Sequence, residues 1–171
     1  MSGSLHTWYS LPDLTRLAAR GAVLNGEIEL KRLTRLNDIL HADSGSVSAS
    51  LRFRQRGGGW LVVQIECDAT LQLTCQRCLE SLTHRVKACV EVGLLEDEAV
   101  EKLMPKGCEP FVLEDGRLLP AQLIEEELIV SLPLVPRHAR SEQCGDLARH
   151  LESLNTEAAG EALDSVPRTG H

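Results

Sequence analysis

Two cysteines in the stretch TCQRCLESLTHRV have the spacing of a metal-binding or redox-active pair. Cys75 and Cys78 are separated by two residues, and they follow a long run in which apolar and polar residues alternate. Such a pair can supply two of the four ligands of a tetrahedral zinc site, or the two thiols of a redox centre. The other half of a zinc site must therefore be sought elsewhere in the chain.

The remaining candidate ligands differ in their surroundings. Cys67 lies on the apolar phase of a predicted strand, so we expect a small buried hydrophobe, and His84 lies on the apolar phase of the next strand. His138 and Cys144, in PRHARSEQC, follow two prolines in a segment with no apolar pattern that would explain either side chain. The favoured Cys3His set for a zinc ion is Cys75, Cys78, His138 and Cys144.

Spacing alone does not distinguish this set from four reduced, unliganded side chains in two unrelated loops. A redox centre fits less well, because thioredoxin-like pairs begin a helix in a βαβ unit, whereas this pair falls between two predicted antiparallel strands. An enzyme such as a nuclease is the alternative function, with an open three-ligand zinc or with Mg²⁺ at Glu96, Asp97 and Glu98. Acidic runs of this kind more commonly suit the first turn of a helix.

Three runs in which apolar and polar residues alternate must position the cysteines. Residues 46–54 and 61–73 each place apolar side chains at every second position, and the glycines of RGGGW separate them. A third run, 82–92, follows CQRC in the same phase. These patterns predict a long antiparallel hairpin with the cysteine pair in the connection between two strands.

The predicted fold is α+β, with a long hairpin-based antiparallel sheet that could close in a barrel-like way and a few short helices packed on it. The clearest helix spans 119–132, where leucines and an isoleucine recur on one side, and Pro133 and Pro136 end it. Residues 1–144 are predicted to form one domain. Residues 145–171 are polar and alanine-rich, and we expect a mobile tail.

Composition narrows the function classes. The chain of 171 residues has 43% hydrophobic residues, and no run approaches the length of a membrane span. The N-terminus has no secretory pattern, so we expect a cytoplasmic protein in which six cysteines are free or bind metal. Aromatic residues are 3% of the chain, which disfavours binding that depends on stacking many bases.

Charge is unevenly distributed along the chain. Residues 1–60 carry eight Lys or Arg against five Asp or Glu, whereas residues 61–171 carry ten against twenty. A nucleic-acid surface, if the protein has one, is therefore expected in the N-terminal part. The candidate nucleic-acid-binding residues are Arg52, Arg54 and Arg56 on one strand face, with Lys31, Arg32 and Arg35 in the preceding helix. The alternative is a solvated arginine face.

Three consecutive glutamates on the 119–132 helix offer the opposite charge. Glu125, Glu126 and Glu127 fan over about 200° of the helix, so at least one must lie near its apolar border. They are the candidate docking residues for a basic partner protein. A plain solvated helix face is the alternative.

An ordered set of motifs resembles one family. CQRCLE, then EPF, then LIEEELIVSLPLVPRH and a following cysteine, Cys144, are similar to the bacterial and plastid large ribosomal RNA subunit accumulation protein YceD. The likeness spans most of the chain and begins with PDLTRLAARGAVLNGEIELKRLTRL. CQRC alone has little specificity, whereas its combination with the acidic helix ending in LPLVPRH is specific.

The resemblance implies a non-enzymatic role in the synthesis, processing or stability of 23S ribosomal RNA. Precursor RNA is then the expected ligand of the six basic residues, and a basic ribosomal protein or assembly factor is the expected partner of Glu125, Glu126 and Glu127. Relatives that carry cysteines after the Leu-Pro-x-x-Pro turn support His138 and Cys144 as the second ligand pair. The end of the chain departs from the family: relatives often finish with a Pro-Phe-Ala-x-Leu tail, whereas this sequence finishes DSVPRTGH. Functions that depend on that tail are not implied here.

Overall fold

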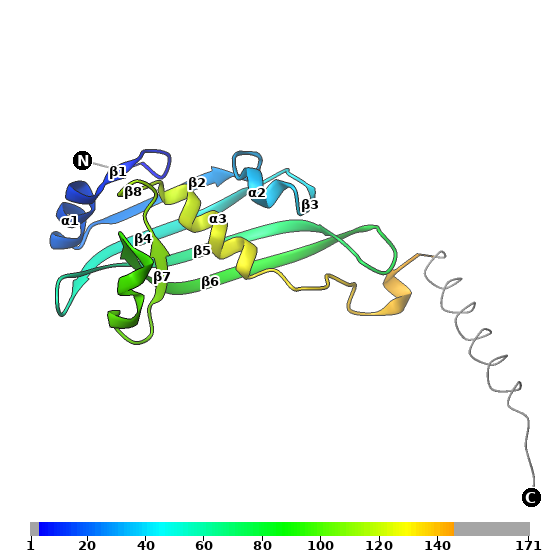
Figure 1. The fold of residues 1–171 in the computed structure, drawn as a ribbon. Coiled ribbons are helices and arrows are strands. Elements are labelled where there is room, and N and C mark those ends of the chain that lie inside the picture. The colour runs from blue at the N-terminus through cyan, green and yellow to red at the C-terminus, as the bar shows by residue number, and fades with distance from the viewer. Residues whose placement is uncertain (1–3, 146–171) are drawn as a thin grey trace, which may run out of the picture.

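A computed structural model describes residues 4–145, which are built around an open six-stranded sheet (Figure 1). The strands are β2 (Val23–Glu29), β3 (Leu40–Ala42), β4 (Ser46–Arg56), β5 (Trp60–Thr74), β6 (Ser81–Leu95) and β7 (Glu109–Val112). β2, β4, β5 and β6 are antiparallel neighbours in that order, β7 adds to β6 in parallel, and β3 pairs with β5 beyond the end of β4. The predicted α+β class is confirmed, but the sheet does not close, so the barrel-like form is wrong.

Short helices and a second small sheet complete the described residues. The helical segments are α1 (Leu11–Ala19), α2 (Thr34–Asn37), α3 (Pro120–Val130) and the 3-10 turns η1 (Leu30–Arg32), η2 (Glu98–Leu103) and η3 (Ser141–Gln143). β1 (Tyr9–Ser10) pairs with β8 (Arg117–Leu118). α3 begins at Pro120, where a proline costs no hydrogen bond, and it ends before Pro133.

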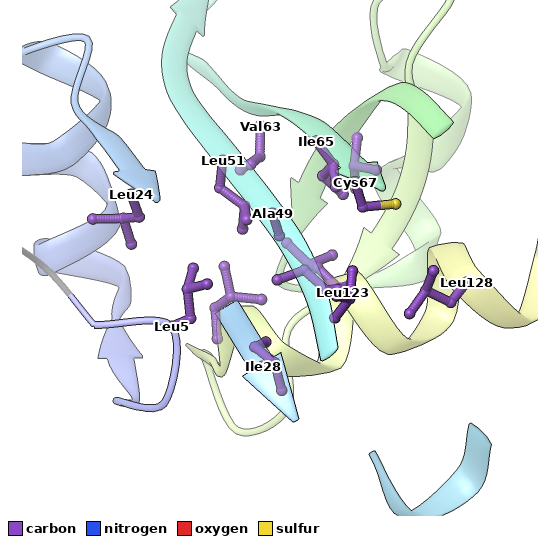
Figure 2. Packing of buried hydrophobic residues seen from close by; sticks show 14 of the residues in the cluster. Leu5, Leu24, Ile28, Ala49, Leu51, Val63, Ile65, Cys67, Leu123 and Leu128 are labelled. Atoms are coloured by element: carbon purple, nitrogen blue, oxygen red, sulfur yellow. The ribbon is translucent and has the colours of Figure 1, made fainter. Parts of the chain in front are cut away.

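The inner face of the sheet holds the main core. Alternate residues of β4 and β5, such as Leu51 and Ile65, are buried in one cluster with Leu14 of α1 and Leu123 of α3. Figure 2 shows these strand side chains gathered with those of α3. Apolar and polar residues alternate over the eleven residues of β4 and the fifteen of β5, so each strand has one buried and one more exposed face, as predicted.

A row of small residues crosses the inner face. Gly26, Ala49, Cys67 and Ala88 are successive register partners on β2, β4, β5 and β6. A Cβ atom on Gly26 would lie 3.0 Å from a methyl carbon of Leu5. The row therefore lets the N-terminal segment approach the sheet closely, which a larger side chain at this glycine would prevent.

The outer face of the sheet consists of the polar-phase residues of the four long strands. Its members are Val23, Asn25, Glu27 and Glu29 on β2; Ser46, Ser48, Ser50, Arg52, Arg54 and Arg56 on β4; Gln64, Glu66, Asp68 and Thr70 on β5; and Arg85, Lys87, Cys89 and Glu91 on β6. These side chains are exposed or half-buried. Apart from Gly145, the predicted tail 145–171 lies outside the described residues.

Candidate metal centre

The tip of the β5–β6 hairpin is a tight turn that brings two cysteine sulfurs together. Cys75 directly follows β5, and its backbone N–H donates to the carbonyl of Glu80 at 2.9 Å. The N–H of Leu79 donates to the carbonyl of Cys75 at 2.8 Å. The turn buries the side chains of both Cys75 and Cys78, as a ligand pair at a hairpin tip requires.

The segment after α3 is fastened to this turn by backbone contacts. Because Pro133 and Pro136 cannot continue the helix, the chain leaves α3 and runs towards the hairpin tip (Figure 1). The N–H of Gln76 donates to the carbonyl of Pro136 at 2.8 Å, and the Arg77 guanidinium donates to the carbonyl of His138 at 3.2 Å. These bonds place the two predicted ligand pairs side by side.

The four predicted ligands form one group whose donor atoms all lie within 4.8 Å of one another. The Cys144 sulfur is 3.9 Å from the Cys75 sulfur, and Nδ1 of His138 is 3.5 Å from the sulfurs of both Cys78 and Cys144. Ligands about 2.3 Å from a tetrahedral zinc ion stand about 3.8 Å apart. The group can therefore hold a metal ion, and its separations match a tetrahedral site.

Backbone amides favour a thiolate at the first ligand. Burial acts to raise the pKa of Cys75, but N–H groups of His138, Arg77 and Cys78 point at its sulfur and lower that pKa to about 5. Burial, together with the sulfurs of Cys78 and Cys75, raises the pKa of Cys144 to about 11. Sulfurs packed this closely cannot all carry a negative charge unless a cation compensates them.

The thiols are separate from the main core. Cys75, Cys78 and Cys144 form their own buried cluster, with only Leu82 packed against it among the described hydrophobic residues. So small an apolar cluster contributes little hydrophobic free energy. The structure of the hairpin tip therefore depends mainly on its backbone hydrogen bonds, and a metal ion held by the four candidate ligands would stabilise it further.

The turn contains one strained backbone position, and this leads to a first testable prediction. Leu79 has a φ of 63°, in the left-handed region, and its side chain is 66% exposed. We expect Leu79→Gly to raise the stability of the tip by about 0.5–1 kcal/mol, because relief of strain exceeds the entropic cost of glycine. Thermal unfolding of the metal-loaded protein measures the change.

The neighbouring residue provides the control for this prediction. Glu80 has no positive φ, so Glu80→Gly is expected to lower stability by about 0.5–1 kcal/mol through backbone entropy alone. Equal losses in the two variants would contradict the strain at Leu79.

The other cysteines stand apart from the ligand group. Cys67 is buried on the inner face, as expected, and burial raises its pKa to about 11. Cys89 is exposed on the outer face, and the sulfur of Cys108 lies 3.5 Å from the Arg56 guanidinium. His84 is half-buried on β6. The exclusion of Cys67 and His84 from the predicted set agrees with this placement.

The six basic residues predicted to bind RNA do not form one group. Arg52, Arg54 and Arg56 point from the outer face at one end of β4. η1 and α2, which carry the other three, follow Glu29, and Glu29 pairs with the opposite end of β4. Six residues of strand separate the two ends, which is about 20 Å. The expectation of a single dense group is wrong.

The basic residues of η1 and α2 also differ from those of β4 in their ion-pair partners. Lys31 and Arg32 lie 3.3 and 3.7 Å from carboxylate oxygens of Glu29, and Arg35 lies 2.6 Å from Glu126 of α3. The residues of η1 and α2 therefore neutralise nearby acids. On β4, Arg56 pairs with Glu91 at 2.5 Å and Arg54 donates to the Gln64 side chain.

The three glutamates of α3 also have three different environments. Glu125 is only 7% exposed, and its carboxylate accepts from the N–H groups of Arg35 and Leu36 at 2.8 and 3.1 Å, capping α2. Glu126 pairs with Arg35, whereas burial raises the pKa of Glu127, whose carboxylate accepts from the Ser131 hydroxyl. The three side chains therefore do not share one exposed face, and docking of a basic protein at them stays a prediction.

Sequence reasoning missed the tertiary capping role of Glu125. The only signal was that one of three consecutive glutamates had to lie near the apolar border of its helix. The residue that it caps is about ninety positions away along the chain. No local pattern connects the two.

Comparisons with known proteins complete the description. No helix of the described residues is long and apolar enough to cross a membrane. No solved structure matches the chain. The family model of the large ribosomal RNA subunit accumulation protein YceD matches residues 63–168, which include all four ligands of the candidate metal centre. The chain therefore belongs to the YceD family of large ribosomal RNA subunit accumulation proteins.

Proposed function

We propose that this protein supports the accumulation of large-subunit ribosomal RNA, without catalysis, by binding precursor RNA through the arginines of β4. The observation that carries the proposal is an open hollow of about 440 Å³ on the outer face, lined by Gly21, Arg52, Arg54, Gln64 and Glu66. The family function supplies the RNA class, and the arginines supply phosphate contacts that need no base sequence.

Zinc is the proposed occupant of the ligand group. Three thiols and an imidazole in a tetrahedral arrangement favour zinc over hard cations such as Mg²⁺ or Ca²⁺. Bound there, zinc would hold the segment after α3 on the hairpin tip. The proposed role of the metal is therefore structural.

The donor set also supports a non-enzymatic role. Four protein ligands would fill a tetrahedral coordination shell, whereas a catalytic zinc keeps one position for water or substrate. The acidic run at 96–98 has a local function, because the Asp97 carboxylate accepts from the N–H of Ala99 at 2.9 Å and caps η2. This contact favours the helix-start interpretation over a Mg²⁺ site.

The proposal predicts that Arg52/Arg54→Glu weakens binding to a precursor large-subunit RNA fragment by about tenfold or more at low salt. Both side chains are exposed and leave the core untouched. The salt dependence of log K should become shallower by about 1.4, because two contacts of about 0.7 each are lost on single strands. Filter binding across a salt titration measures both quantities.

Lys31/Arg32→Glu is the matched control, because it makes the same change of charge at the other end of β4. Its RNA affinity is expected to stay within about threefold of wild type, since these residues already pair with Glu29. Equal weakening by both variants would mean that general charge, rather than the β4 arginines, determines the affinity. Unchanged affinity in Arg52/Arg54→Glu would reject the proposed surface.

A further inference from the structure

A groove runs along the middle of the outer face, over the part of β4 that carries Ser48 and Ser50. Ser48 and Ser50 form its floor, and it is open to solvent, with a volume of about 760 Å³. The flanking positions on β2 and β5 carry longer side chains, among them Glu27 and Glu66. Because β2 and β5 are two strand spacings apart, the walls stand about 10 Å from each other, which is wide enough for an extended peptide.

The groove has an excess of negative charge. Its charged lining residues are Glu27, Glu66, Asp68 and Lys87, three acids and one base. Asp68 is compensated, because Arg85 and Lys87 lie 2.9 and 3.2 Å from its carboxylate and lower its pKa. Within residues 4–145, neither Glu27 nor Glu66 has an ion-pair partner.

The two uncompensated carboxylates have a definite spacing. Glu27 is the register partner of Ser48, and Glu66 is the partner of Ser50, so they stand on opposite walls two residues apart along the groove. Their backbone positions are about 12 Å apart. In an extended chain that lies along the groove, side chains an odd number of positions apart point to opposite walls, so basic side chains three positions apart can reach both glutamates.

We propose that this groove binds an extended segment of a partner protein that carries two lysine or arginine residues three positions apart. The serine floor gives room and hydroxyl groups for the peptide backbone, and the glutamates pair with its cations. The groove shares Glu66 with the arginine hollow, but its lining contains no arginine and has three acids against one base, so it suits cations better than phosphate. The site goes beyond the proposed RNA surface.

The test uses a fluorescein-labelled glycine-serine peptide with two arginines three positions apart, measured by fluorescence polarisation at low salt. We expect Glu27→Gln/Glu66→Gln to weaken its binding by about tenfold. Ser48→Tyr should cause a comparable loss without a change of charge, because the ring fills the floor at an exposed strand position where tyrosine suits the sheet. Glu80→Gln/Glu101→Gln, which removes two exposed carboxylates outside the groove, should bind like wild type.

Three results would overturn the inference. They are equal binding by the groove variant and its control, equal binding of a peptide with glutamates in place of the arginines, and competitive displacement of the peptide by single-stranded RNA from the Arg52/Arg54→Glu variant, whose RNA surface is removed. The Arg52/Arg54→Glu variant is expected to bind the peptide at least as tightly as wild type, because it removes nearby positive charge. Loss of peptide binding and loss of RNA binding therefore report on separate proposals.

Discussion

Replacement of Cys144 by serine is expected to abolish stoichiometric metal binding and to release the segment after α3 from the hairpin tip. The Cys144 sulfur is fully buried and lies within 3.9 Å of the Cys75 sulfur and 3.5 Å of the His138 ring. A neutral serine hydroxyl is a poor substitute for a thiolate on zinc. Loss of a partner outside the ligand shell already costs 10–100-fold in affinity, so loss of a ligand should exceed about 100-fold.

The consequence for stability should be large but local. Structural zinc contributes roughly 10–16 kcal/mol in small zinc-finger peptides, far more than so small a thiol cluster provides by packing. Cys75, Cys78 and Cys144 form a cluster of their own, and none of them belongs to the main core. Without metal, the bond from Gln76 to Pro136 should exchange its hydrogen rapidly, whereas the amides of β4 and β5 should stay protected.

Elemental analysis and hydrogen exchange of the full chain test this expectation together. Cys89→Ser is the matched control, because that thiol is exposed on the outer face and outside the ligand group. The control should keep about one ion per chain and a protected tip. Full metal content and unchanged protection in Cys144→Ser would show that Cys144 is not a ligand.

The long strands could be predicted because their information is local. In β4 and β5 every second residue is apolar, and this period fixed both the strand type and the buried face, including that of Cys67. The short strands were harder to predict. β7 joins β6 in parallel, and β8 pairs with β1 more than a hundred residues away, so neither pairing leaves a periodic signal.

The metal centre could be predicted in part for a different reason. His138 and Cys144 stood out because nothing in their own segment required them, and prolines had already ended the helix before them. Their approach to Cys75 depends on the bond between Gln76 and Pro136, which joins segments sixty residues apart. Side-chain chemistry therefore identified the candidate ligands, and only the fold could bring them together.

The grouping of the six basic residues could not be predicted, because it depends on where the fold places each of them. Lys31, Arg32 and Arg35 seemed in sequence to extend the β4 arginines, yet the turn after β2 carries them to the other end of the sheet, beside Glu29 and Glu126. Charge counts along a chain do not specify which strand end a residue occupies. Sheet register decides that, and register depends on pairing between distant segments.

The glutamate that caps α2 should have the second large effect. We expect Glu125→Ala to lower the free energy of unfolding by about 2–4 kcal/mol, because the part-buried N–H of Arg35 and the buried N–H of Leu36 lose their acceptor. Leu33 at the N-cap provides no side-chain acceptor to replace it. Urea unfolding monitored by circular dichroism measures the loss.

Glu126→Gln separates this capping role from the charge of the helix. That side chain makes a surface ion pair with Arg35, so its replacement should change stability by less than about 1 kcal/mol. Equal effects of the two variants would contradict the cap. The contrast also bears on any charge reversal across 125–127, because a lysine at Glu125 would bury a cation beside two backbone donors. Loss of partner binding in such a triple variant would therefore report the loss of α2 rather than a docking face.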